Sequence, residues 1–202
     1  MHPNLKNLTC ALVLLISLGA VANGQTLDNG IGLRLGEPFG VTYKRYLSDY
    51  KAIEFIIGRN YNGNSNYYRR NFDDINGFNN LNYVSHNVDI AFAFQARWLS
   101  HFDFLDDHIS GLKAYYGLGA LMGYNKVDYL VDNLEVPGVL LVEETRNNFD
   151  LGAEGILGIE YTLHNAPVSF FGETSLYTEV ADNPFRLRVL GAIGARYNFI
   201  HL

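Results

Sequence analysis

The chain has 202 residues, a length that suits one domain, and its 15 basic and 21 acidic residues give a net charge of −6. This acidic balance argues against nucleic acid as a partner. Hydrophobic residues make up 48% of the chain, yet the mean hydropathy is close to zero, so apolar and polar residues must be interleaved. The 14 Tyr, 13 Phe and 20 Gly suit an all-β chain, because aromatic residues pack well on pleated sheets.

The first 24 residues have the parts of a secretory signal peptide. Lys6 supplies a positive charge, residues 11–21 form a run of apolar residues with Ser17 as its one polar member, and small residues precede Gln25 at the −3 and −1 positions. This run of 11 residues is too short to span a bilayer as a helix, which takes about 20. We therefore expect cleavage between Gly24 and Gln25, with residues 1–24 the signal peptide and residues 25–202 the mature domain.

The expected mature chain has neither a cysteine nor a recognisable cofactor motif. Cys10 precedes the apolar run, whereas a lipidated cysteine would follow it, and no other cysteine is present. Removal of Lys6 leaves 14 basic and 21 acidic residues, a net charge of −7. The histidines do not have the spacing of metal ligands. We therefore expect no cofactor and no metal.

Eight segments of the mature chain alternate between apolar and polar residues with a period of two. This pattern predicts strands that have one apolar and one polar face. The eight segments are residues 30–36, 40–47, 51–60, 84–98, 112–126, 148–163, 168–180 and 185–199.

The charges on the polar faces indicate which way the strands face. A soluble sandwich or lipocalin would turn its apolar faces inward, and a membrane barrel turns them toward lipid. The polar faces carry seven basic and seven acidic residues, a balance that a narrow lumen needs because unpaired buried charges are costly. The expected lumen charge network comprises Arg34, Lys44, Glu54, Asp89, Arg97, Lys113, Asp150, Glu154, Glu160, Glu173, Glu179, Arg186, Arg188 and Arg196. Within it, we expect the last three arginines to face Glu154, Glu160, Glu173 or Glu179.

These faces predict an all-β fold, a transmembrane antiparallel up-and-down β-barrel of eight strands. Glycines on the polar faces, Gly32, Gly117, Gly119, Gly158 and Gly194, would make room inside a narrow barrel. With the N-terminus in the periplasm, the connections at 48–50, 99–111 and 164–167 are periplasmic. Those at 37–39, 61–83, 130–145 and 181–184 are then extracellular, which puts the two longest connections outside, as in known barrels.

Pro137-Gly138 predicts the turn of the fifth hairpin. This dipeptide fits the centre of a type II turn. If Val136 pairs with Val139, partner numbers sum to 275, so Leu118 would pair with Leu157. Even residues then face odd ones, in agreement with the apolar faces assigned separately to the two strands. Each arm would be longer than the roughly ten residues that cross a membrane, so this hairpin should project beyond the lipid.

Two motifs resemble those of known outer-membrane barrels. The segment from Gly194 through Tyr197 to Phe199 resembles the C-terminal assembly signal of these proteins, and residues 32–44 resemble the opening hairpin of a widespread outer-membrane barrel family. The architecture resembles that of the small eight-stranded barrels, such as OmpX and the OmpA membrane domain. The resemblance implies a cell envelope protein of the Gram-negative outer membrane, assembled through its C-terminal strand by the barrel-assembly machinery. Function does not follow from it, because relatives share the fold with diverse roles.

The sequence favours a structural or surface-interaction role without catalysis. Interiors of eight-stranded barrels are just wide enough to be filled by side chains, so we expect a plugged lumen and a monomer surrounded by outer-membrane lipid. A small passive channel is the alternative, and a lipid-modifying enzyme the third hypothesis. Aromatic residues among the many Asn of residues 61–83 suit recognition, so this segment and residues 130–145 are candidates for an extracellular ligand.

Catalytic hypotheses have little support in the residue pattern. Ser85 and His86 are the only pair that suggests a hydrolase, and adjacent residues point to opposite faces of a strand. Glu154 with Glu160, or Glu173 with Glu179, could act as paired carboxylates, but ion pairing to the nearby basic residues is the simpler interpretation. His101 and His164 are expected at solvated turns. No catalytic residues are therefore predicted.

Overall fold

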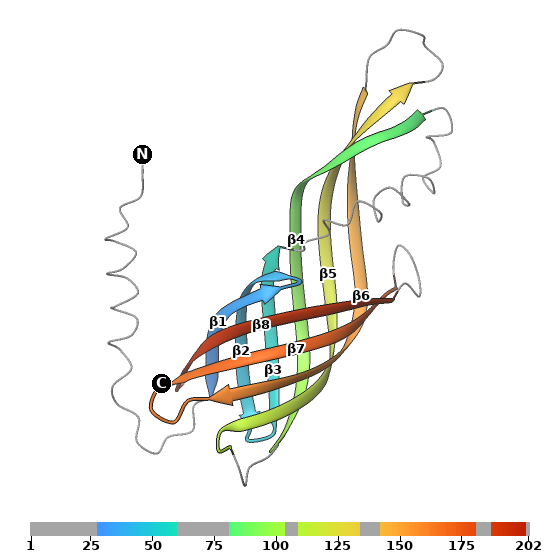
Figure 1. The fold of residues 1–202 in the computed structure, drawn as a ribbon. Helices are drawn as coiled ribbons and strands as arrows, with labels where there is room; N and C mark the ends of the chain where they lie inside the picture. Colours follow the sequence, from blue (N-terminus) through green and yellow to red (C-terminus); the bar gives the residue numbers. More distant parts are fainter. Residues whose placement is uncertain (1–27, 60–80, 104–108, 134–141, 181–186, 201–202) are drawn as a thin grey trace, which may run out of the picture.

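Eight antiparallel strands follow one another around a closed barrel (Figure 1). The computed structural model describes residues 28–59, 81–103, 109–133, 142–180 and 187–200. Its strands are β1 (Asn29–Gly36), β2 (Phe39–Ser48), β3 (Lys51–Arg59), β4 (Leu81–Asp103), β5 (Leu112–Asn133), β6 (Val142–Thr162), β7 (Val168–Glu179) and β8 (Leu187–Phe199). Each strand pairs with the next, and β1 pairs with β8 to close the sheet. The predicted eight-stranded antiparallel barrel is confirmed.

The predicted strand limits are close for all the strands except β4, β5 and β6. β5 continues to Asn133, whereas the predicted segment ends at residue 126. β4 begins at Leu81 and continues to Asp103, beyond both predicted limits, and β6 begins at Val142 rather than at residue 148. The predicted connections at 99–111 and 130–145 are therefore partly strand. We call one end of the barrel the turn end. It is formed by Asp28, the β2–β3 turn, residues 109–111 before β5, the β6–β7 turn and Ile200.

The register of the β5–β6 hairpin differs by two residues from the prediction. Leu118 pairs with Gly155 rather than with Leu157, and partner numbers along the hairpin sum to 273, not 275. A shift of two residues leaves every side chain on its predicted face, because the faces alternate with a period of two. The alternation therefore could not distinguish the two registers. Pro137 and Gly138 lie outside the described residues.

β4 departs from regular alternation at two irregularities in its pairing with β5. They fall between Tyr83 and Ser85 and between Val88 and Ile90. Bulges of this kind place two residues opposite one on the partner strand. The prediction of unbroken alternation from Val88 to Trp98 is therefore wrong near Val88.

The outer surface of the barrel is apolar and the interior is charged. Leu118 and Val189 are 74% and 76% exposed on the outside, while Lys44, Glu54 and Arg97 are buried inside. The pattern is opposite to that of a water-soluble protein, in which large apolar side chains are buried. None of the described residues forms a helix that is long and apolar enough to cross a membrane.

Exposed aromatic residues mark both edges of the apolar surface on β5 and its neighbours. Phe92, Tyr124 and Phe149 form one row across β4, β5 and β6, and Phe102 contacts Tyr116 nearer the turn end. From Tyr116 to Tyr124, β5 has nine residues. A tilted transmembrane strand takes about 9–11 residues, and aromatic side chains gather at both membrane interfaces.

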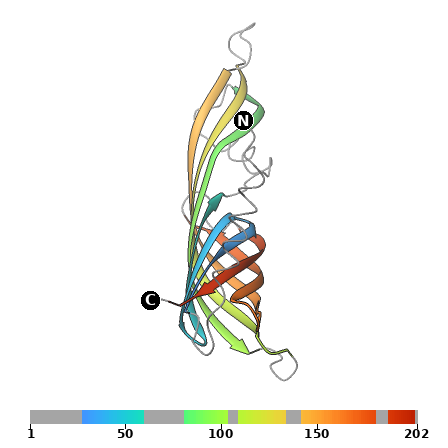
Figure 2. The ribbon, with the colours of Figure 1, turned by 90° about the vertical axis from the view of Figure 1, so that its left-hand side faces the viewer.

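We call the row formed by Phe92, Tyr124 and Phe149 the upper aromatic row. Beyond it, on the side away from the turn end, three strands continue as a sheet that projects from the barrel (Figures 1 and 2). We call this sheet the extension: residues 81–91 of β4, 125–133 of β5 and 142–148 of β6. Pairing of β4 with β3 ends at Ala93, and pairing of β6 with β7 ends at Gly152, so both edges of the extension lack a neighbouring strand in the described part of the chain. The hairpin therefore projects, as the sequence predicted.

In the extension the inner face is apolar and the outer face is polar, which is the opposite of the arrangement in the barrel. On the inner face of β5, Val127, Tyr129 and Val131 are at most 3% exposed. On the outer face, Lys126 and Asp128 replace the apolar residues found lower on the strand. An apolar inner face and a polar outer face suit a sheet surrounded by water. The two faces of β5 therefore exchange polarity at the upper aromatic row, which is also the edge of the apolar outer surface.

Candidate functional site

Four basic and four acidic side chains meet in the middle of the lumen. Alternation turns one residue in two toward the barrel axis, and in a barrel of eight strands the opposite walls are close enough for these side chains to touch. All eight have side chains that are 5% exposed or less. This central network consists of Arg34, Lys44, Arg97, Arg196, Glu54, Glu154, Glu160 and Glu173.

Arg97 joins three strands of the barrel from its position on β4. Its Nε and Nη2 donate to the two oxygens of Glu154 at 2.8 and 3.1 Å, a bidentate arrangement. Its Nη1 donates to Glu173 Oε1 at 2.6 Å and lies 3.6 Å from Glu54 Oε2. A single guanidinium therefore faces three carboxylates that lie far apart in the sequence.

Arg196 occupies the corresponding place on β8. It forms ion pairs with Glu54 and with Glu160, the latter at 2.5 Å, and its guanidinium lies 3.7 Å from the centre of the Phe171 ring. Lys44 Nζ donates to Glu160 Oε2 at 2.8 Å. Glu160 therefore has two cations, as well as a hydrogen bond from the Tyr46 hydroxyl at 2.5 Å.

Arg34 and Tyr115 complete the network around Glu173. Arg34 donates to Glu173 Oε1 from Nε and Nη2 at 3.1 and 2.9 Å, and its Nη1 donates to the Pro38 carbonyl at 2.6 Å. The Tyr115 hydroxyl donates to Glu173 Oε2 at 2.7 Å. Each carboxylate of the central network thus has at least one cation, which offsets the cost of burying it.

The other residues of the predicted lumen network do not belong to the central network. Asp150 and Glu179 are buried nearer the extension, where Asn125 donates to Asp150 at 2.9 Å. Lys113 is not in the lumen network: it is partly exposed at the turn end, 3.9 Å from Asp103. The side chain of Asp89 and all of Arg186 lie outside the described residues.

Arg188 also departs from its predicted pairing. It pairs with Glu37, not with Glu154, Glu160, Glu173 or Glu179, and both side chains are about a quarter exposed. Glu37 lies between β1 and β2, at the rim of the barrel, so Arg188 belongs to that rim rather than to the interior. A residue in a turn carries no alternation signal, which is why the sequence did not indicate this partner.

Several uncharged residues of the interior were not predicted as site residues. Thr42 donates to Glu54 at 2.5 Å, and Gln95 donates to Glu154 at 3.3 Å. Tyr46 and Tyr115 bring their hydroxyls to carboxylates, as described above. Their positions on the polar faces were the available signal, since every second residue of these strands points inward.

Two of the predicted glycines make room for specific side chains. A Cβ on Gly158 would lie 2.4 Å from Cζ of Tyr115, and a Cβ on Gly119 would lie 2.9 Å from both Arg97 Cγ and Glu154 Oε1. Both contacts are too short for real Cβ atoms. The absence of side chains at these positions is therefore a condition for the network to fill the lumen.

The histidine and serine candidates have other contacts. His86 Nδ1 is 2.6 Å from the Tyr83 hydroxyl, its ring packs on Tyr129 in the extension, and partial burial lowers the pKa of this histidine. Ser85 is exposed. His164 is exposed as expected, but the prediction of a solvated His101 is wrong: this residue is 5% exposed, and its Nε2 lies 2.8 Å from Lys44 Nζ. The described residues include no cluster of three potential metal ligands.

The residues of the predicted assembly signal lie on the strand that closes the barrel. Gly194 is opposite Arg34 of β1, Tyr197 is opposite Ile31, and Phe199 is opposite Asn29. Gly24 and Gln25, the predicted cleavage site, lie outside the described residues.

A closed eight-stranded barrel, an apolar outer surface bounded by aromatic residues and a charged interior together define a small outer-membrane β-barrel. The chain is therefore an integral protein of the outer membrane.

Comparisons with known proteins add structural neighbours. No protein-family model and no curated protein matches the sequence. The N-terminal β-barrel domain of Pseudomonas aeruginosa OprF has a TM-score of 0.47 and 11% identity, over 85% of this chain and 94% of that one. Neisserial surface protein A, NspA, has a TM-score of 0.42 and 15% identity, over 85% and 93% of the two chains.

Proposed function

We propose that this protein is a monomeric outer-membrane barrel with a closed lumen, which acts through its surface rather than through a pore or a catalytic site. It is exported by a signal peptide that is cleaved after Gly24, and the barrel-assembly machinery inserts it through the C-terminal strand. We assign the turn end to the periplasmic side of the membrane and the extension to the extracellular side, because periplasmic turns are short in such barrels.

The observation that carries the proposal is the central network. Four cations and four carboxylates, linked by contacts of 3.6 Å or less, occupy the section that a solute would have to cross. Apolar clusters lie next to it, one formed by Leu99, Tyr115 and Ile156 with Ala52, and one by Leu121, Tyr177 and Leu190. These groups support a plug rather than a channel, and the ion pairs also occupy the carboxylates that acid–base catalysis would need.

Conductance measurements test the closed lumen. The purified protein is reconstituted in planar bilayers, with an open porin as the positive control. We expect no steady single-channel conductance from the intact barrel. A reproducible conductance that depends on the amount of folded protein would instead support the passive channel. Loss or gain of a lipid species in cells that lack the gene would support the lipid-modifying enzyme.

The extension is the proposed interaction surface. It projects beyond the upper aromatic row, has a polar outer face and has two edges without neighbouring strands in the described chain. Such edges expose backbone donors and acceptors that a partner strand or loop can use. Residues 81–83, 130–133 and 142–145 of the candidate ligand segments form part of it, and the rest of these segments lies outside the described residues.

A trimmed barrel tests the role of the extension. An Asn-Gly turn joins Lys126 directly to Asn147, two residues that pair across the hairpin. We expect the trimmed barrel to insert and fold but to fail to restore whatever phenotype the intact gene restores in a deletion strain. Full complementation by the trimmed barrel would show that the extension is dispensable and would contradict the surface role.

Export and orientation are tested on the same protein. N-terminal sequencing of the outer-membrane fraction should begin at Gln25, and a start at Met1 would contradict cleavage. In intact cells, a membrane-impermeant thiol reagent should label Thr145→Cys in the extension. It should label Ser48→Cys at the turn end only after the outer membrane is opened. The reverse pattern would contradict the orientation.

A further inference from the structure

A groove of about 560 Å³ crosses the outer surface of the barrel on β4 to β7, nearer the turn end than the extension. Large side chains line it, with small residues of β7 between them: Phe102, Tyr116, Leu157 and Ile159, then Gly172 and Thr174. The Thr174 hydroxyl donates to the Leu190 carbonyl at 3.1 Å, so it is not available to a ligand. The volume is within the range of about 300–1,000 Å³ that is usual for ligand pockets. The groove therefore suits an apolar occupant.

The strand register shows that this groove rises obliquely from the turn end. One row of paired residues crosses the outer surface from β3 to β7: Lys51, Ser100, Tyr116, Leu157 and Thr174. Lys51 is the first residue of β3, whereas Thr174 lies in the middle of β7. Four strand spacings of about 4.8 Å make the row roughly 19 Å long. One leaflet contributes about half of the roughly 30 Å hydrocarbon core, so a chain that lies obliquely along this row stays within one leaflet.

Two basic side chains lie where this row meets the turn end. Lys51 and Arg45 are both exposed on the outer surface of the barrel. Arg45 is opposite Ile53, two residues from Lys51, so the two cations are diagonal neighbours on adjacent strands. Neither side chain forms an ion pair or a hydrogen bond with any residue in the described part of the chain.

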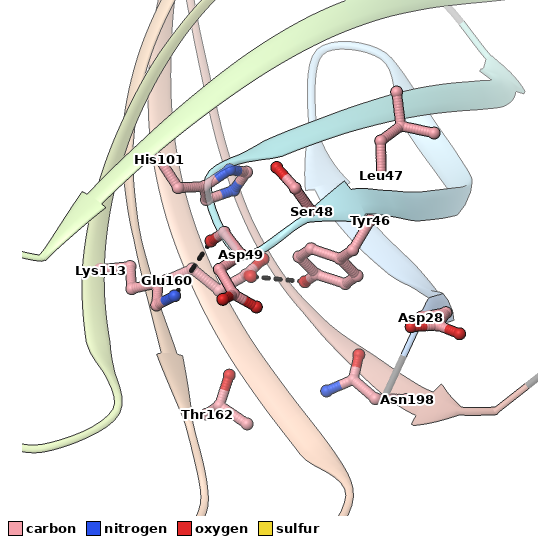
Figure 3. Close-up of a pocket in the computed structure, with 10 residues that line it drawn as sticks. All are labelled: Asp28, Tyr46, Leu47, Ser48, Asp49, His101, Lys113, Glu160, Thr162 and Asn198. Atoms are coloured by element: carbon pink, nitrogen blue, oxygen red, sulfur yellow. Dashed lines mark hydrogen bonds between the residues drawn. The ribbon is translucent and has the colours of Figure 1, made fainter. Parts of the chain in front are cut away.

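The acidic residues nearby have other surroundings. Asp28 and Asp49 line a separate cavity at the turn end, together with His101 of the barrel interior (Figure 3). Asp103 lies 3.9 Å from Lys113. The two cations on the outer surface are therefore available to an anionic group at the membrane surface.

We propose that this groove binds one phospholipid of the periplasmic leaflet, with an acyl chain between Phe102 and Gly172 and an anionic headgroup against Lys51 and Arg45. The groove is continuous with the lipid-facing surface, so a lipid reaches it without leaving the membrane. Lipid tails are as apolar as the groove, so the hydrophobic effect gives no preference for it. The preference comes instead from close packing along the groove and from the charge of the headgroup. Only the choice of leaflet rests on the proposed orientation.

Quenching of Trp98 fluorescence by brominated lipids tests the binding. Trp98 is the single tryptophan, is half-exposed on the outer surface and lies two residues from Ser100 of the row. The mature barrel is folded in phosphatidylcholine vesicles that contain a small fraction of brominated phosphatidylglycerol or, separately, of brominated phosphatidylcholine. Each cation at a membrane surface favours an anionic lipid by roughly fivefold. We expect phosphatidylglycerol to be enriched around Trp98 by about fivefold or more.

Two pairs of variants separate the headgroup from the chain. Arg45→Gln with Lys51→Gln should abolish the enrichment, and Arg59→Gln, which removes an exposed cation at the other end of β3, should leave it unchanged. Gly172→Leu fills the groove and should remove most of the enrichment, whereas Gly155→Leu, on the outer surface but outside the groove, should not. Both glycines have room for a side chain, since a Cβ would meet no atom closer than 3.9 Å at Gly172 and none within 4 Å at Gly155. Circular dichroism of the β-sheet verifies that each variant is folded.

The outcomes identify what occupies the groove. Equal quenching by the two lipids would show an ordinary surrounding of lipid and would overturn the proposal, as would an enrichment that persists without Arg45 and Lys51. An enrichment that Gly172→Leu leaves intact would contradict the groove as the site of the chain. A doubled mass in native mass spectrometry that Gly172→Leu abolishes would assign the groove to a second copy of this chain instead. None of these results bears on the closed lumen or the extension, which conductance and the trimmed barrel test separately.

Discussion

Removal of Arg97 and Glu154, singly and together, measures how strongly the central network depends on charge balance. Removing one partner of a buried ion pair costs about 3–5 kcal/mol because it leaves an uncompensated charge. Arg97 faces three carboxylates, so we expect Arg97→Met to destabilise the barrel by about 5 kcal/mol. Glu154→Gln leaves Arg97 with Glu173 and Glu54, so its cost should be near 3 kcal/mol, the lower limit.

The double variant should cost much less than the sum of the single ones. Without Arg97 and Glu154 the remaining lumen charges balance again, since Glu173 keeps Arg34 and Glu54 keeps Arg196. We expect a total of about 5 kcal/mol rather than about 8, which gives a coupling energy of about 3 kcal/mol, at the upper limit for residues in contact.

The assay is reversible urea unfolding in lipid vesicles, followed by the fluorescence of Trp98. This residue lies half-exposed on the outer surface next to Arg97, so its emission reports whether β4 is in lipid. The matched control is the pair Lys113 and Asp103, which is partly exposed at 3.9 Å and should couple by less than about 1 kcal/mol. Additive costs at Arg97 and Glu154 would refute the pairing inside the lumen.

Two further predictions concern glycine positions and the lipid surface. Gly158→Ala should destabilise the barrel by about 1–3 kcal/mol because its Cβ would overlap the Tyr115 ring, whereas Gly155→Ala, with no atom within 4 Å, should be nearly neutral. Ala120→Arg should cost about 2–4 kcal/mol, because Ala120 lies midway between Tyr116 and Tyr124 on the lipid surface, while Thr145→Arg on the extension should cost little. Equal effects within either pair, measured by the same unfolding assay, would contradict the assigned environments.

The sequence was sufficient to predict the barrel because the alternation that defines each strand can be recognised within that strand alone. Each strand repeats the same alternation, so the eight segments, their faces and the approximate turns follow from the period of two. The same period explains what was missed. A register shift of two residues in the β5–β6 hairpin leaves the alternation intact. The irregularities of β4 lie in a part of the strand where the alternation of polar and apolar residues is weak, so they gave no clear signal.

The sequence predicted the membership of the lumen network better than its contacts. Arg97 and Arg196 were expected to face inward, and they do, but no pattern along a strand indicates which of several acids on the opposite wall is in reach. His101 was assigned to a solvated turn because β4 was predicted to end at residue 98. The strand continues to Asp103, which carries His101 into the barrel beside Lys44.

The inversion of polarity along β5 is the central claim of this account, and a cysteine scan of residues 116–131 tests it most directly. The variants are reconstituted in lipid vesicles and treated with a lipid-soluble and then a water-soluble thiol reagent. Even positions from 116 to 124 should react with the lipid-soluble reagent alone, and even positions from 126 to 130 with the water-soluble reagent alone. Residues 127, 129 and 131 should react with neither. Lipid labelling that continued unchanged above Tyr124, or a labelling period of 3.6 residues, would contradict a membrane barrel with a water-exposed extension.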